Sequence, residues 1–118
     1  MSVDKRMLSL AATVAREALN RQDNRSFRLG AVGMRNDGVI VFSRNIAATD
    51  VTPSAHAEAR VIKKLTPESF VWVARISRNT EEWALARPCW RCLNQLKTAG
   101  VKKVIYTISP NEWGTIQF

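Results

Sequence analysis

The only histidine and the only two cysteines of the chain fall in two short motifs, and these constrain the fold more than any other feature. The motifs read His56-Ala57-Glu58 and Pro88-Cys89-Trp90-Arg91-Cys92. Structural zinc sites are usually closed by four protein ligands, whereas catalytic sites use three and leave the fourth position for water. One histidine and two cysteines therefore indicate a catalytic site, and the fold must bring His56, Cys89 and Cys92 around one ion.

The order of the two motifs resembles the signature of the zinc-dependent cytidine deaminase superfamily, H-x-E followed by P-C-x-x-C. The chain is most similar in outline to the small cytidine and deoxycytidylate-type deaminases. The resemblance implies one Zn²⁺ per chain, held by His56, Cys89 and Cys92, with Glu58 as the catalytic proton carrier. It implies hydrolytic deamination of a nucleobase, in which zinc activates water and Glu58 returns protons to the ring nitrogen and the departing amine.

The same three residues have simpler readings. His56 could be a core histidine, and Cys89 and Cys92 could be buried small hydrophobic residues, since free cysteine packs well in cores. A disulfide between the two cysteines is a further alternative. No secretory hydrophobic segment opens the chain, so a reducing, cytoplasmic location is expected instead.

Length and charge limit the remaining possibilities. At 118 residues and 46% hydrophobic content, the chain predicts one catalytic domain over residues 1–118. No apolar run approaches membrane-spanning length, so no membrane partner is expected. The net charge of +8 attracts phosphate-bearing molecules. Most basic residues are spread along the chain, which is typical of solvated faces.

Periodicity and turn residues predict an alternation of helices and strands. Helices are expected over residues 4–20, 52–65 and 88–99, and strands over 30–35, 39–42, 69–76, 101–108 and 114–118, with residues 79–86 as a polar connection. Asn36-Asp37-Gly38 predicts a hairpin turn, and Pro53 and Pro88 suit first helical turns. Both metal-binding motifs then lie where helices begin, and the positive end of a helix favours cysteine thiolates.

The last two strands are separated only by residues 109–113. A parallel pair needs a crossover of about a dozen residues or more, so this pair must be antiparallel if the tail is a strand. Within the superfamily, an antiparallel final pair resembles the enzymes that act on free nucleosides. The expected architecture is a three-layer α/β/α cytidine deaminase-like fold, with a mixed five-stranded sheet and an antiparallel final strand pair.

The resemblance also implies residues that contact substrate. The segment Phe27-Arg28-Leu29-Gly30-Ala31 resembles the family segment F-x-x-G-A that lines the base pocket, where Phe27 could stack on the base. Asn45 matches the family asparagine that contacts the sugar. Ala57 would offer its backbone N–H to the base. Phe27 could instead pack the first helix against the sheet, and Asn45 could be a turn residue. One departure is clear: the glutamate that follows the asparagine in free-cytidine deaminases is absent from Asn45-Ile46-Ala47.

Arg28, Arg87 and Trp90 are further candidates for substrate contacts. Arg87 could approach a phosphate or cap the local helix. Trp90 could close the pocket, contact a flanking nucleotide or pack under a loop. Trp83 and Trp113 are candidates for an interface between subunits.

Three functions remain at this point. The leading hypothesis is a zinc-dependent deaminase that converts a cytosine nucleoside or nucleotide, as a small-molecule substrate, to the uracil form. The alternative is a deaminase that edits cytosine or adenine in single-stranded DNA or RNA, which the basic charge favours and the short chain does not. The third is a zinc module without catalysis, against which Glu58 argues. By resemblance, a homo-oligomer, either dimer or tetramer, is expected.

Overall fold

The computed structural model describes residues 2–17, 27–44, 61–77, 80 and 82–118. The elements, in chain order, are α1 (Val3–Glu17), β1 (Phe27–Met34), β2 (Ile40–Arg44), β3 (Phe70–Ser77), β4 (Trp83–Ala84), α3 (Trp90–Thr98), β5 (Lys103–Ser109) and β6 (Glu112–Gln117). The predicted first helix is confirmed as far as Glu17. Most of the predicted helix 52–65 lies outside the described residues, of which 61–62 are helical and 63–64 form a turn.

Among the described residues, six strands form one mixed sheet. Five of the strands follow the order β2-β1-β3-β5-β6, and β4 pairs with β3 outside this order. The β3–β5 pair is parallel and the other pairs are antiparallel. The α/β class is confirmed, but the expected number of five strands is wrong. The additional strand, β4, has only two residues within the predicted polar connection, so it carries no alternation that a sequence pattern could reveal.

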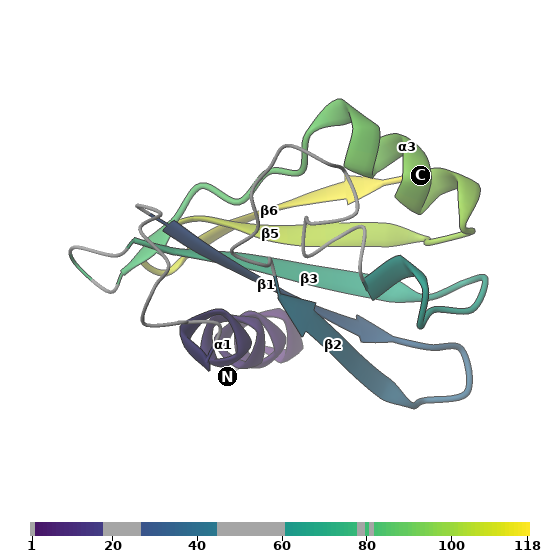
Figure 1. Cartoon of the computed structure of the whole chain (residues 1–118), viewed down its shortest axis with the longest axis horizontal. Coiled ribbons are helices and arrows are strands. Elements are labelled where there is room, and N and C mark those ends of the chain that lie inside the picture. Colours follow the sequence, from purple (N-terminus) through teal and green to yellow (C-terminus); the bar gives the residue numbers. More distant parts are fainter. Residues whose placement is uncertain (1, 18–26, 45–60, 78–79, 81) are drawn as a thin grey trace.

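Helices cover both faces of the sheet (Figure 1), as the three-layer expectation requires. Side chains alternate along β3, so Val71 and Val73 belong to the cluster that contains Leu96 of α3. Ala74 and Ile76 belong to a cluster with alanines of α1 on the opposite face. The continuous apolar run of β3 is thus explained by burial on both sides, which is typical of a central strand.

Gly30 in β1 allows α1 to lie directly on the sheet. A Cβ atom added at Gly30 would lie 2.2 Å from the Ala11 carbonyl oxygen and 2.7 Å from the Ala15 amide nitrogen. Both atoms belong to the helix backbone, so the helix itself would have to move. The small residues Ala11, Ala12 and Ala15 are fully buried at this contact. Close approach of the two backbones therefore explains the glycine of the F-x-x-G-A segment.

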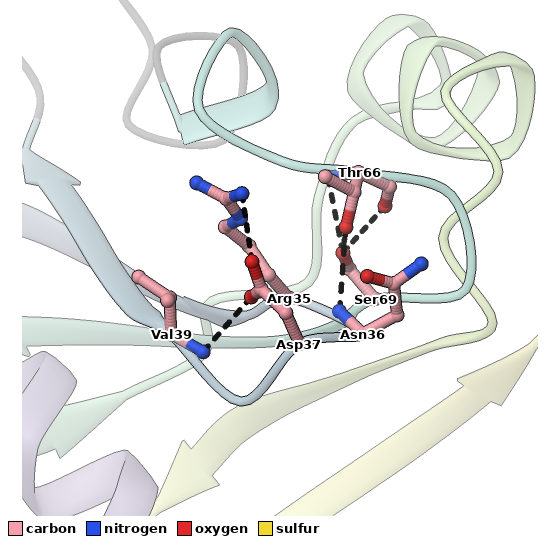
Figure 2. Close-up of polar contacts among 6 residues, drawn as sticks. All are labelled: Arg35, Asn36, Asp37, Val39, Thr66 and Ser69. Carbon is pink, nitrogen blue, oxygen red and sulfur yellow. Dashed lines mark hydrogen bonds and ion pairs between the residues drawn. The ribbon is translucent and has the colours of Figure 1, made fainter.

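The hairpin between β1 and β2 is confirmed at Asn36-Asp37-Gly38 (Figure 2). Asp37 accepts hydrogen bonds from the Val39 amide at 3.1 Å and from the Arg35 guanidinium at 2.9 Å. Gly38 has φ +86°, a conformation that glycine adopts without strain. The Asn36 amide donates to Thr66 Oγ1 at 3.3 Å, which joins the turn to the segment before β3.

The β5–β6 pair is an antiparallel hairpin, as the short connection predicts. Its register runs from Lys103 opposite Gln117 to Ser109 opposite Glu112. Asn111 has φ +63° in the turn, and asparagine tolerates this left-handed conformation better than most residues. Strand β5 begins at Lys103, two residues after the expected start at 101. Strand β6 begins at Glu112, two residues before the expected start at 114.

Candidate metal and substrate site

Both cysteines lie at the N-terminal end of α3. Cys89 is the N-cap residue, with φ −67° and ψ 163°, and Cys92 lies in the first turn of the helix. The Leu93 amide donates to the Cys89 carbonyl oxygen at 2.9 Å and closes this turn. The prediction that Pro88 occupies the first helical position is wrong, because Pro88 precedes the N-cap and the extended conformation of Cys89 ends the incoming segment.

The two thiols fit a zinc ion by their chemistry. Both cysteines are free, so the alternative of a disulfide is wrong; Cys89 is exposed and Cys92 is buried. The Cys89 side chain makes no capping hydrogen bond to the helix, and the first turn of α3 contains no acidic residue. Helix N-termini favour anions, and thiolates are the form of cysteine that binds zinc. This end of α3 can therefore supply two of the three expected ligands.

The other expected members of the site lie outside the described residues. These are His56, Ala57 and Glu58 of the first motif, and Asn45. Within the described ranges, no three His, Cys, Asp or Glu side chains come close enough to hold a metal ion. A complete ligand set accordingly needs a residue from the undescribed part, and His56 stays the prediction for it.

Thr107 of β5 holds the segment that leads to the cysteines, a role that the sequence did not indicate. Its hydroxyl donates to the Ala84 carbonyl oxygen at 2.7 Å and accepts from the Arg75 amide at 3.2 Å. Its own carbonyl oxygen accepts from the Ala86 amide at 2.9 Å. Thr107 is fully buried. The only sequence signal of this position is a threonine within an apolar strand, and that signal does not identify its hydrogen-bond partners.

Arg87 packs on Tyr106 instead of capping the helix. Its Nη1 atom donates to the Tyr106 hydroxyl oxygen at 3.4 Å, and its guanidinium carbon lies 5.9 Å from the ring centroid. Tyr106 is 8% exposed. A Cβ atom at Gly114 would lie 2.6 Å from Tyr106 Cζ, so the glycine makes room for the ring. Arg87 precedes Cys89 by two residues and is exposed at the surface.

Trp90 is the most exposed of the large apolar residues in the described part of the chain. Its side chain is 71% exposed, and the Arg91 guanidinium carbon lies 5.8 Å from its ring. The alternative that Trp90 packs under a loop is therefore wrong for the loops that the structure describes. Trp83 and Trp113 are instead partly buried and pack against core clusters beside α1 and β3.

The structure does not bring Arg28 together with the cysteines. Alternation along β1 places position 28 on the same face as Gly30, toward α1, whereas α3 lies on the other face. Arg28 is 4% exposed. Phe27 is the first residue of β1 and pairs with Ser77; its side chain lies outside the described part.

Two shallow depressions lie near the ends of the strands where β3 and β5 begin. Their volumes are about 440 and 380 Å³, and Phe70 and Lys103 line both. The chain reaches this end of the sheet from the C-terminal end of α3, through residues 99–102. These depressions are therefore separate from the cysteines at the start of α3.

The chain thus folds as an α/β/α domain with two free thiols, a candidate zinc centre, at the N-terminal end of α3. Comparison with known families supports a deaminase-like domain. Residues 1–108 match the family model described as the cytidine and deoxycytidylate deaminase zinc-binding region. The chain belongs to this family. The match includes both motifs and ends within β5.

Solved cytidine deaminases share the fold at low sequence identity. The enzyme from Burkholderia pseudomallei has a TM-score of 0.71 and 17% identity, over 99% of this chain and 93% of that one. The enzyme from Mycobacterium leprae has a TM-score of 0.60 and 18% identity, over 98% and 94%. That from Mycobacterium tuberculosis has a TM-score of 0.59 and 17% identity, over 93% and 90%. No curated protein sequence gives a significant match. In the described residues, no helix is long and apolar enough to cross a bilayer.

Proposed function

We propose that the chain is a zinc-dependent hydrolytic deaminase that converts a cytosine nucleoside or nucleotide to its uracil form and releases ammonia. The observation that carries the proposal is the pair of free thiols at the N-terminal end of α3, where the first turn contains no acidic residue. The chain that carries them belongs to the cytidine and deoxycytidylate deaminase family. The printed names of the similar structures, all cytidine deaminases, support cytosine as the base.

In this proposal Cys89, Cys92 and His56 hold one zinc ion per chain. Zinc, when bound, supplies a Lewis acid that makes water a nucleophile near neutral pH. Glu58 accepts one proton of the attacking water and delivers it to the ring nitrogen. It then accepts the remaining proton of the added hydroxyl and delivers it to the departing amine, so that ammonia leaves and a carbonyl remains. Phe27, Asn45 and the Ala57 amide orient the base and the sugar.

The second candidate function is deamination of cytosine or adenine within a single strand. The exposed Trp90 with Arg91 beside it favours this alternative, because nucleic-acid-binding surfaces combine aromatic platforms with cations. The third candidate, a zinc module without catalysis, would keep the thiols and need no proton carrier.

A substrate panel distinguishes the three functions. Zinc-loaded protein is incubated with cytidine, deoxycytidine, their monophosphates and single-stranded DNA and RNA, and ammonia and product mass are measured. Chelated protein is the control. The proposal expects turnover of a small molecule that stops on chelation. Turnover of oligomers alone would favour the second function, and no turnover by fully zinc-loaded protein would favour the third.

Assembly and location complete the proposal. We expect a homo-oligomer, either dimer or tetramer, in the cytoplasm. On the edge strand β2, Ile40 and Phe42 are 37% and 53% exposed and lie on one side of the strand, as at a subunit contact. Light scattering after size-exclusion chromatography tests the assembly, and a monomer at all concentrations would contradict it.

A further inference from the structure

The sheet of the described residues ends in two edge strands, β2 and β6 (Figure 1). In an antiparallel ladder, the backbone groups of every second residue point away from the neighbouring strand. The Arg35 amide bonds the Val39 carbonyl oxygen, so along β2 the backbone groups of Ile40, Phe42 and Arg44 point outward. An edge whose outward groups are unpaired is a template for a strand of another chain.

Lys64 closes the middle of the β2 edge. Its ammonium group donates to the outward carbonyl oxygen of Phe42 at 2.7 Å. Lys64 is itself exposed, so a strand that paired here would have to displace the bond and desolvate the charge. The β2 edge is therefore protected against strand addition. The side chains of Ile40 and Phe42 lie on a face of the sheet, so a contact through them does not need this edge.

The outer edge of β6 has no such protection. The Phe118 amide bonds the Lys102 carbonyl oxygen, which sets the alternation of the β5–β6 ladder. The backbone groups of Trp113, Thr115 and Gln117 therefore point outward. Within the described ranges, no hydrogen bond reaches these outward groups. The strand also contains neither lysine nor proline, the residues that commonly block an edge.

The sequence of β6 fits a second copy of itself. In an antiparallel pair with the Thr115 residues opposite each other, Trp113 lies opposite Gln117 of the second copy, so every outward group finds a partner. The two threonines then form a favourable cross-strand pair. Glu112 is the only charged residue of β6 and stands at its start, so the carboxylates of the two copies lie at opposite ends of the contact.

Such a contact is closed, because it uses the same strand of both chains. Both β6 edges become covered, and the β2 edges at the two ends of the joined sheet are protected by Lys64. We propose that a second copy of the chain adds to the sheet through β6, antiparallel across a twofold axis at Thr115, and that Lys64 prevents strand addition at β2. The inference names one contact of the proposed homo-oligomer and depends on neither zinc nor deamination.

Amide hydrogen exchange, followed residue by residue by NMR, tests where strands pair. Exchange is compared at low and high protein concentration, with enough sodium chloride to screen the repulsion between two chains of net charge +8. We expect exchange of the Trp113, Thr115 and Gln117 amides to slow at least about tenfold at the higher concentration. The outward amides of Ile40 and Phe42 should keep their rates. Unchanged rates on β6, with or without protection on β2, would overturn the inference.

Substitutions of Thr115 test the same contact through the dimer dissociation constant, measured by analytical ultracentrifugation. Thr115→Pro removes an outward N–H, Thr115→Lys places two positive charges opposite each other, and the control Thr115→Val keeps the shape and the N–H. We expect the first two to raise the constant at least about tenfold and the control to change it little. Thr115 is exposed, so Thr115→Lys stays informative if proline weakens the fold. A dimer that survives both substitutions is formed elsewhere, which refutes pairing at β6.

Lys64→Ala tests the protected edge, and Lys63→Ala is its matched control because both lysines are exposed neighbours. We expect Lys64→Ala to form larger species than the wild type and Lys63→Ala to form none. Wild-type sizes in Lys64→Ala would refute the role of Lys64.

Turnover measured on the same samples separates this inference from the proposed function. Pairing at β6 in a protein that deaminates no cytosine compound supports the inference and refutes the function. Deamination by a protein whose β6 amides stay unprotected does the reverse.

Discussion

Replacement of Thr107 by valine tests how the cysteine segment is held in place. Valine preserves the shape of the side chain but removes the hydroxyl that joins the Arg75 amide to the Ala84 carbonyl oxygen. Thr107 is fully buried, so water cannot readily replace these bonds at its side chain. The Arg75 amide and the Ala84 carbonyl also lie opposite each other in the β3–β4 pair, so neither group depends on the hydroxyl alone. A hydrogen bond contributes a net of about 0.5–1.5 kcal/mol, so we expect the loss of two to cost about 1–3 kcal/mol.

Urea denaturation measures this loss, and the matched control is Thr107→Ser. Serine keeps the hydroxyl and removes one methyl group, which costs about 1 kcal/mol. We also expect a chelator to remove zinc faster from the valine variant than from the serine variant, because residues 84–86 lead directly to Cys89. The reasoning fails if valine is as stable as the wild type, or if serine is the more damaging change.

Three further substitutions test other parts of the structure. Gly30→Ala should destabilise the fold by about 3 kcal/mol or more, since the new Cβ would collide with the Ala11 carbonyl oxygen; a wild-type urea midpoint would disprove the close packing of α1. Cys92→Ala should no longer bind one zinc per chain, and its melting temperature in the presence of zinc should fall below that of the zinc-loaded wild type. Zinc content is measured by atomic absorption, and a variant that retains one zinc per chain would exclude Cys92 as a ligand. Trp72→Phe should cost about 1–3 kcal/mol by removing the 3.0 Å bond to Asp4, as denaturation can measure, and an unchanged stability would show that this bond contributes nothing.

Features set by local chemistry were predictable from the sequence. The turn at Asn36-Asp37-Gly38 follows from residues that tolerate positive φ and from a side chain that bonds its own backbone. The direction of β6 follows from a connection too short for a crossover. The helix that carries Cys92 follows from its apolar spacing and from Gly100, which has φ +86° just beyond the helix.

Features set by distant contacts were not predictable. Strand β4 exists because Trp83 and Ala84 meet the end of β3, and two residues have no period of their own. The contact between Arg87 and Tyr106 joins positions 19 residues apart and depends on space left by Gly114. The resemblance associated Gly30 with the base pocket, whereas the structure gives it a contact with α1 on the opposite face from α3.

The most direct test of the proposed function compares the zinc-loaded wild type with zinc-loaded Glu58→Gln. Ammonia release from cytidine, deoxycytidine and their monophosphates is measured together with the zinc content of each sample. We predict that the wild type deaminates at least one of these compounds, and that the variant keeps one zinc per chain but loses at least about a hundredfold in turnover. Turnover by the variant at the wild-type rate, or none by a fully zinc-loaded wild type, would contradict the account.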